Sequence, residues 1–368
     1  MIIEKATRLN STEEYYFATK LREIAKRKAD GEDIINLGIG SPDLMPPDDG
    51  IDELMKQSTN TQSHGYQSYT GIPQLRQAFA TWYEVYFGVS LNPESEVLPL
   101  MGSKEGIMHI SLAFLNPGDK VLVPDPGYPA YNAVANIVGA EVVKYNLREE
   151  NNWLPDFEEL TNLATENVKI LWLNYPHMPT GTQATLAMFE QLIRFAGQHK
   201  ILVVNDNPYS FILNESPQSI LSVPGAKEVV IELNSLSKSH NMAGWRIGCV
   251  AGDSEYLKCI VAIKSNMDSG MFKPMQLAAV KALAKDRNWY KAINAEYAVR
   301  QLMAMEVFDI LKVKYNKAQS GMFVWGKVPP EYKDSYAFSD HFLDSKSVFI
   351  TPGAIFGKNG EQYVRISL

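Results

Sequence analysis

The sequence has few cysteines, no excess of positive charge and no long hydrophobic run. Its two cysteines, Cys249 and Cys259, each lie in an apolar segment, which fits a reducing compartment better than a disulfide-stabilised secreted fold. The formal net charge of −7 argues against a nucleic-acid partner, because phosphate binding usually requires a basic excess. No segment approaches the roughly 20 apolar residues of a membrane-spanning helix, and the charged N-terminus does not resemble a secretory signal. We therefore expect a cytoplasmic protein without a nucleic-acid or membrane partner.

Histidine is also scarce, and its distribution bears on metal binding. The six histidines are scattered without the spacing of metal ligands, so we expect no metal site. The remaining composition, with 45% hydrophobic and 21% charged residues, is that of an ordinary globular protein. A length of 368 residues favours two domains or one domain with large additions.

The middle of the chain alternates short apolar runs with segments of helical period. The runs are rich in Val, Ile and Leu and lack clean polar alternation, which is typical of strands buried on both faces. The expected strands are residues 120–125, 168–176, 200–209, 228–237 and 245–252. A helix over 184–200 ends in a basic last turn. This alternation predicts an α/β fold with a mostly parallel sheet between two layers of helices.

The two ends of the sequence differ from this middle part. Residues 286–315 have the pattern of a long helix that could link two domains, and short strands follow it to the C-terminus. Chain termini often lie together, so the N-terminal residues could pack with this unit. We therefore predict a large three-layer domain over residues 46–282 and a smaller α+β domain built from residues 1–45 and 283–368.

Polar and glycine-rich segments follow several of the expected strands. They are residues 174–181, 205–209 and 234–240, and Gly102 and Ser103 begin a further expected helix. Ligands bind beyond the carboxyl ends of strands in open α/β sheets, and a helix N-terminus favours an anion. We therefore expect these segments to converge on one ligand site.

The residue types in these segments match one kind of ligand. A phosphate could take Ser103, Ser235, Ser237 and the guanidinium of Arg246. An aldehyde could form a Schiff base with Lys238, and a pyridine nitrogen could pair with Asp206. Pyridoxal 5′-phosphate carries all three groups.

The same segments give the chain a close resemblance to the class I/II aminotransferases, which are fold type I pyridoxal-phosphate enzymes. Matching motifs occur in order from about residue 36 to the last residue, and the ordered set is highly specific. They are LGIGSPD (37–43), YQSYTGIPQLRQA (66–78), GSKEG (102–106), PGYPAY (126–131), NYPHMPTG (174–181), NDNPY (205–209), SLSKSHNMAGWRIG (235–248) and YVRISL (363–368).

The resemblance implies a role for each matching residue. Lys238 is similar to the lysine that forms the Schiff base and moves the substrate proton, Asp206 to the partner of the pyridine nitrogen, and Tyr209 to the donor to the ring oxygen. The phosphate site would contain Ser103, Lys104, Ser235, Ser237 and Arg246, and Tyr128 would stack on the ring. Asn174 belongs to the matching turn. Arg365, with Gly40 nearby, would bind the substrate carboxylate, although an internal carboxylate is an alternative partner for Arg365.

The resemblance also implies an activity and an assembly. The expected function is ping-pong transfer of an amino group between an amino acid and a 2-oxo acid. A carbon–sulfur lyase that catalyses β-elimination uses the same cofactor and is an alternative, as is a non-catalytic cofactor-binding regulator. Tyr66 matches a tyrosine that reaches the other subunit's cofactor, so we expect a homodimer.

One position departs from the family pattern. Met178 stands where the family usually has a second asparagine that donates to the cofactor's ring oxygen. Methionine cannot donate a hydrogen bond. We therefore predict that the pKa of the Lys238 imine is higher than the family norm.

Overall fold

The central feature of the computed structural model, which describes residues 2–11 and 16–368, is a seven-stranded sheet. In spatial order its strands are β2 (Val97–Leu100), β8 (Gly248–Gly252), β7 (Val230–Ser235), β6 (Leu202–Asp206), β5 (Val168–Leu173), β3 (Lys120–Asp125) and β4 (Glu141–Asn146). Only β8 runs antiparallel to its neighbours within this described sheet. The predicted mostly parallel α/β fold is therefore confirmed.

The helices vary widely in length. They are α1 (Tyr16–Ala29), α2 (Asp48–Ser58), α3 (Pro73–Phe87), α4 (Ser103–Phe114), α5 (Pro129–Val138), α6 (Phe157–Leu163), α7 (Leu186–His199), α8 (Leu236–Ser239), α9 (Ser254–Lys264), α10 (Lys273–Leu283), α11 (Arg287–Ile310) and α12 (Ser335–Lys346). None of the helices in the described ranges is long and apolar enough to cross a membrane.

Two separate cores on opposite faces of the sheet create the three layers. Successive side chains of a strand point to opposite faces, and β3 illustrates this: Val121 and Val123 join the core under α4, α5 and α9, whereas Leu122 joins the core under α3 and α7. Because both faces are covered, the interior strands are apolar at most positions, which explains why their sequences lack polar alternation.

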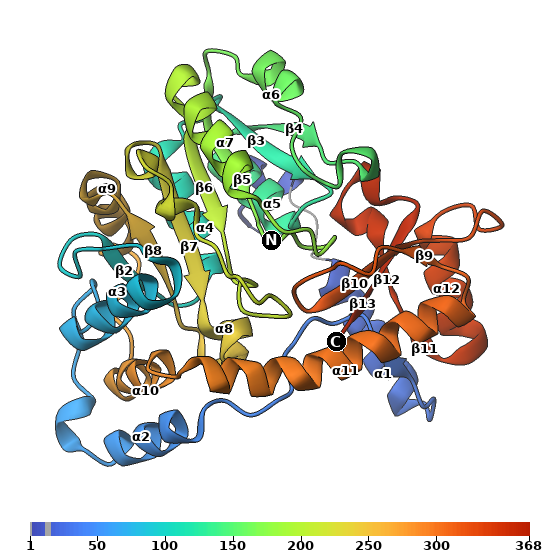
Figure 1. Ribbon diagram of the computed structural model, residues 1–368, viewed down its shortest axis with the longest axis horizontal. Coiled ribbons are helices and arrows are strands. Elements are labelled where there is room, and N and C mark those ends of the chain that lie inside the picture. Colours follow the sequence, from blue (N-terminus) through green and yellow to red (C-terminus); the bar gives the residue numbers. More distant parts are fainter. Residues whose placement is uncertain (1, 12–15) are drawn as a thin grey trace.

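The C-terminal part forms a small antiparallel sheet beside the large one. Its strands, in spatial order, are β12 (Thr351–Pro352), β13 (Tyr363–Ser367), β10 (Phe323–Lys327) and β9 (Lys314–Tyr315). Helix α11 runs from the helices around the large sheet to this small one (Figure 1). The helix ends earlier than the 286–315 pattern suggested, because Lys312 adopts a left-handed φ of 56° and the chain turns into β9.

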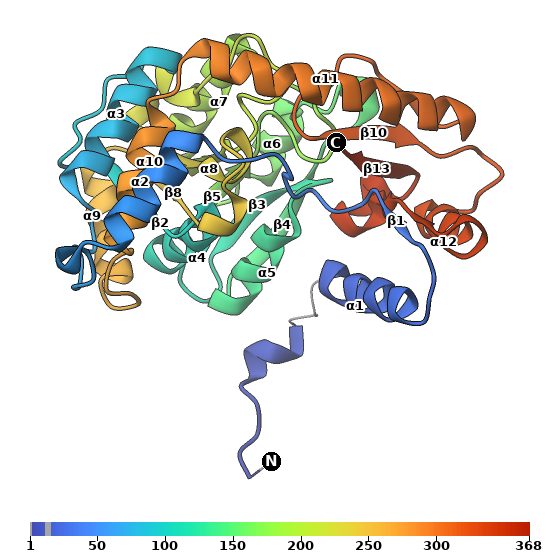
Figure 2. The ribbon, with the colours of Figure 1, turned by 90° about the horizontal axis from the view of Figure 1, so that it is seen from below.

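Helix α1 and strand β1 (Ile35–Asn36) pack against the C-terminal part, as Figure 2 shows. Strand β1 pairs in parallel with β11 (Val348–Phe349). Helix α1 lies on α12, where Arg27 Nη2 is 2.7 Å from Asp344 Oδ1 and Ile24 is buried with Leu343. This packing brings residues 17–40 to the same side of the molecule as β13. The domain boundaries at residues 45/46 and 282/283 stay a prediction.

Candidate active site

A cavity of about 630 Å³ lies beyond the carboxyl ends of β5, β6 and β7 and is lined by all but one of the predicted site residues. These lining residues are Gly40, Ser103, Lys104, Tyr128, Asn174, Asp206, Tyr209, Ser235, Ser237, Lys238, Arg246 and Arg365. The exception is Tyr66, which is 93% exposed and lines a separate surface hollow with Phe272. Strand ends therefore bring together residues that are up to about 330 positions apart in the sequence.

Lys238 lies on the short helix α8, which starts directly at the end of β7. Ser235 caps this helix, because its Oγ accepts a hydrogen bond from Ser237 N at 3.1 Å. The Lys238 ammonium donates to the Gly40 carbonyl at 2.5 Å. Burial, together with the positive charges of Arg365 and Arg246, lowers the pKa of Lys238 to about 8. Near pH 8, the fraction of Lys238 side chains that are neutral amines is therefore larger than for an ordinary lysine.

A chain of four buried residues, to which the sequence motifs assigned no role, holds the Lys238 turn in place. Ser239 Oγ lies 2.8 Å from His240 Nδ1, and His240 Nε2 lies 2.9 Å from the Tyr290 hydroxyl. The Trp82 indole donates to the same Tyr290 hydroxyl at 3.0 Å. Burial lowers the pKa of His240 to about 3, so the imidazole is neutral. This buried chain links α8 to α11 and α3 and restricts where the Lys238 backbone can move.

Asp206 ends β6 with its carboxyl group fully inside the protein. Its Oδ2 accepts a hydrogen bond from the Tyr131 hydroxyl at 3.0 Å, whereas Oδ1 is buried without a hydrogen-bond partner. Burial raises the pKa of Asp206 to about 7, with Glu232 adding to the rise and the Tyr131 bond opposing it. Asn174 Nδ2 donates to the Asp206 carbonyl at 2.5 Å, so Asn174 holds the strand end. An unpartnered buried carboxylate oxygen calls for a donor or cation from a ligand.

Tyr131 is a further residue that the motif reading did not assign. Its ring stacks on Trp172 with centroids 4.8 Å apart and an interplanar angle of 8°. It is buried beneath Tyr128, whose ring meets it edge to face at 5.5 Å. The sequence could have identified Tyr131 from its spacing, because it follows Tyr128 by three positions at the start of α5 and residues three apart share a helix face.

The opposite end of the cavity has the features of an anion site. Ser103 begins α4, and Arg246 Nη1 donates to Ser237 Oγ at 3.3 Å and to the Ala243 carbonyl at 2.9 Å. Gly102 has a positive φ of 81°, and a Cβ there would overlap the Arg246 guanidinium. The glycine therefore allows the guanidinium to pack against the start of α4, where the first-turn backbone N–H groups and the helix dipole favour a phosphate.

These features together fit pyridoxal 5′-phosphate. The buried Asp206 Oδ1 suits the N–H of a pyridine ring, the α4 end with Arg246 suits a phosphate, and the Lys238 amine suits an aldehyde. The fit rests on the unpartnered oxygen of Asp206 and on the close approach of Arg246 to Gly102 at the start of α4.

Arg365 lies on β13, where its guanidinium is nearly buried among aromatic rings. Its Nη2 donates to the Gly38 carbonyl at 2.9 Å, and its Nη1 lies 3.4 Å from Met178 Sδ. The ring centroids of Phe323, Phe356 and Phe17 lie 3.9, 4.7 and 5.6 Å from Arg365 Cζ. Met178 thus contacts the arginine that the sequence assigns to the substrate carboxylate.

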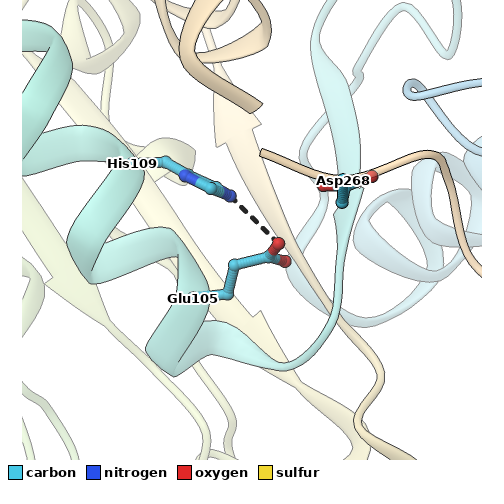
Figure 3. A group of neighbouring side chains, drawn as sticks. All are labelled: Glu105, His109 and Asp268. Carbon is cyan, nitrogen blue, oxygen red and sulfur yellow. Dashed lines mark ion pairs between the residues drawn. The ribbon is translucent and has the colours of Figure 1, made fainter. Parts of the chain in front are cut away.

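A different group of side chains meets the distance criterion for a metal site. The ligand atoms of Glu105, His109 and Asp268 lie within 4.8 Å of one another (Figure 3). The buried ammonium of Lys264, however, forms an ion pair with Asp268 and lies 4.0 Å from Glu105 Oε1. Because this ammonium already pairs with both carboxylates, the group is a buried ion-pair cluster that ties α4 to the loop after α9.

Comparisons with known proteins indicate the same family as the residues of the site. The family model "Aminotransferase class I and II" matches residues 32–368. The LL-diaminopimelate aminotransferase of Dehalococcoides mccartyi is 42% identical over 98% of this chain and 93% of its own length. The substrate-bound structure of BacF from Bacillus subtilis is 35% identical, has a TM-score of 0.96 and matches 99% of this chain and 93% of its own. A mutant aspartate aminotransferase of Thermus thermophilus is 25% identical, has a TM-score of 0.92 and matches 99% and 95%.

The ordered motifs, the three-layer fold, the cavity and these similarities all indicate the same family. The chain belongs to the class I and II aminotransferases, which use pyridoxal phosphate to transfer an amino group between an amino acid and a 2-oxo acid.

Proposed function

We propose that Lys238, Asp206 and Tyr209 carry the amino transfer in this chain, and that Arg365 binds the carboxylate of the substrate. One observation carries the proposal: a single cavity contains the Lys238 amine with its lowered pKa, the unpartnered Oδ1 of Asp206, and Arg365. No feature of the described residues favours the lyase or regulator alternatives over amino transfer.

Two groups of residues hold the cofactor in this proposal. Asp206, Tyr209, Asn174 and Tyr128 surround the ring, and the phosphate site is formed by Ser103, Lys104, Ser235, Ser237 and Arg246. When bound, pyridoxal phosphate supplies an electron sink that stabilises negative charge at the substrate α-carbon. Tyr131 keeps Asp206 in place through its 3.0 Å hydrogen bond, and it is a positioning residue rather than a catalytic one.

Lys238 is the acid–base group of the proposed reaction. Its neutral amine takes a proton from the substrate α-carbon, and the resulting ammonium returns a proton in the later step. The lowered pKa of about 8 increases the fraction of neutral amine available for the first step. Arg365 fixes the α-carboxylate and thereby orients the C–H bond toward the lysine. The 2-oxo acid then enters the same cavity after the first product leaves, which gives ping-pong kinetics.

We further propose a homodimer in which Tyr66 reaches the partner's site. Tyr66 is 93% exposed and lies outside its own cavity, which supports a role toward a second copy. Mixing Lys238→Ala with Tyr66→Phe tests this, since a hybrid dimer has one site with both native residues. Recovery of activity on mixing supports the shared site, and no recovery from a proven hybrid contradicts it. The composition supports a cytoplasmic location as part of the same proposal.

The function itself is tested with the purified protein loaded with cofactor. A panel of amino acids is added without any 2-oxo acid, and the absorbance of the bound cofactor is followed. Stoichiometric conversion of the cofactor with release of a 2-oxo acid supports amino transfer. Catalytic release of ammonia with pyruvate supports elimination instead, and no change with any donor counts against the proposal.

A further inference from the structure

The cavity around Lys238 has two unlike halves. Its polar half comes from the ends of the large sheet and from Arg365, as described above. Its other half is apolar and comes from α1, the segment after β1, β10 and the 3₁₀ turn η7 (Gly353–Phe356). The apolar lining residues are Phe17, Ala18, Leu21, Ile39, Phe323 and Phe356.

The charged groups of the polar half already have partners in the proposed function. Asp206 is the one carboxylate among the described residues that line the cavity, and Tyr131 and the cofactor ring engage it. Arg246 and the exposed Lys104, which follows Ser103 at the start of α4, belong to the phosphate end. Within one subunit, a second ammonium or carboxylate on a substrate that lies against the apolar half would find no charged partner among the lining residues, which is costly where the group loses its hydration.

Aromatic rings surround the position where the substrate carboxylate binds. The Arg365 guanidinium lies against the face of Phe323 at 3.9 Å, with Phe356 at 4.7 Å and Phe17 at 5.6 Å. Leu21 lies one turn further along α1 and is 37% exposed, which places it toward solvent on the same wall. A substrate held by Arg365 therefore has apolar and aromatic surfaces next to its side chain.

We propose that the amino donor has a large, uncharged, apolar side chain, in the first place an aromatic one such as that of phenylalanine. This inference rests on the proposed function, because it assumes that Arg365 holds the carboxylate. This preference would distinguish the chain from its relatives named for LL-diaminopimelate. The far end of the LL-diaminopimelate molecule carries both an ammonium and a carboxylate. A hydrophobic pocket discriminates by the area it buries, and a charged group placed in it is strongly disfavoured.

Two measurements on the cofactor-loaded protein test the inference. In the first, kcat/KM is compared for L-phenylalanine, L-leucine, L-glutamate and LL-diaminopimelate. We expect L-phenylalanine to exceed LL-diaminopimelate by about 100-fold. A higher value for LL-diaminopimelate or L-glutamate overturns the inference while leaving amino transfer intact.

The second measurement does not need turnover and so separates the substrate inference from the proposed function. Calorimetry compares the binding of 3-phenylpropanoate with that of pimelate, which has a carboxylate at each end. At least about tenfold tighter binding of 3-phenylpropanoate supports the apolar pocket even if no donor reacts. Equal or tighter binding of pimelate overturns it.

A pair of substitutions locates the selectivity on α1. Leu21→Arg places a cation on the apolar wall at an exposed position that folding tolerates. It should lower kcat/KM for L-phenylalanine about tenfold and raise the relative use of L-glutamate. Leu302→Arg makes the same change on α11 at a position that is 64% exposed and outside the cavity lining, and it should change neither value. Equal effects of the two substitutions contradict the assignment of Leu21 to the substrate wall.

Discussion

The Tyr131 hydroxyl donates a 3.0 Å hydrogen bond to Oδ2 of Asp206, and the other oxygen, Oδ1, is buried without a hydrogen-bond partner. This bond opposes the effect of burial, which raises the pKa of Asp206 to about 7. It therefore keeps more of the carboxylate ionised, and an ionised carboxylate is a stronger acceptor for a protonated pyridine ring than a neutral carboxyl group is.

Removing this hydrogen bond should slow the reaction without removing a catalytic group. Tyr131→Phe should raise the Asp206 pKa, lower kcat about tenfold and weaken cofactor binding, because a buried hydrogen bond to a charged group contributes about 1.5–3 kcal/mol. Tyr145→Phe is the matched control, since it removes a buried 2.8 Å bond to the Trp172 carbonyl. Similar kinetics for the two variants would show that Tyr131 acts only through stability.

The raised pKa of Asp206 also predicts how the stability of the cofactor-free protein depends on pH. Between pH 4 and 7 the folded protein keeps a proton that the unfolded chain has released, so the free energy of unfolding falls as the pH rises. For a pKa raised from 3.8 to about 7, this loss is on the order of 4 kcal/mol across the range. Asp206→Asn cannot titrate and should lack this component.

Urea unfolding of both proteins at pH 4.5 and pH 7 measures this difference. The stability of Asp206→Asn relative to the parent protein should increase from the lower to the higher pH. A constant difference would mean that the Asp206 carboxyl titrates alike in the folded and unfolded chains. Burial also raises the pKa of Glu232, but Glu232 is present in both proteins, so the part of its shift that burial causes is common to both.

Met178 offers a test of the departure from the family motif. Met178→Asn introduces a donor at a position where the side chain now contacts Arg365. A donor to an anionic ring oxygen should lower the pH midpoint of the bound cofactor's absorbance, by about 1 unit. Met178→Leu has a similar size and no donor, and its midpoint should match that of the parent. An unchanged midpoint in the asparagine variant would contradict the prediction.

Arg365 should be needed for its geometry as well as for its charge. Arg365→Lys keeps the charge but loses the planar fork that can bind a carboxylate with two hydrogen bonds. The KM for the amino donor should rise about 10- to 100-fold, which steady-state kinetics measures. Arg300→Lys serves as a control, because Arg300 pairs with Asp43 outside the cavity lining. Comparable KM values for both variants would argue against a carboxylate role for Arg365.

In the large sheet, the sequence predicts the strands that have continuous apolar runs but does not single out β4 and β2. Residues 120–125 were expected as a strand and form β3, whereas β4 was not singled out. β4 is the edge strand, and it keeps partly exposed and charged positions such as Glu141 and Lys144, so its pattern is weaker. β2 has only four residues. Buried interior strands are thus easier to recognise than short or edge strands.

The same distinction applies to the site. Lys238, Asp206 and Arg246 lie in ordered motifs, so the sequence could assign them. Phe17 could not be assigned, because its contact with Arg365 depends on how α1 packs against α12 and joins residues about 350 positions apart. The Ser239–His240–Tyr290 chain likewise depends on where α11 crosses α8, which no local pattern encodes.

In the proposed function, Lys238 is the residue that bonds the cofactor. Borohydride reduction makes a lysine–cofactor bond permanent, so reduction of the cofactor-loaded protein followed by peptide mass mapping identifies the bonded lysine. We expect the added mass on the peptide that contains Lys238, and none on the peptide that contains Lys104, the other lysine lining the cavity. Added mass on Lys104 or elsewhere, with Lys238 unmodified, would show that Lys238 does not bond the cofactor.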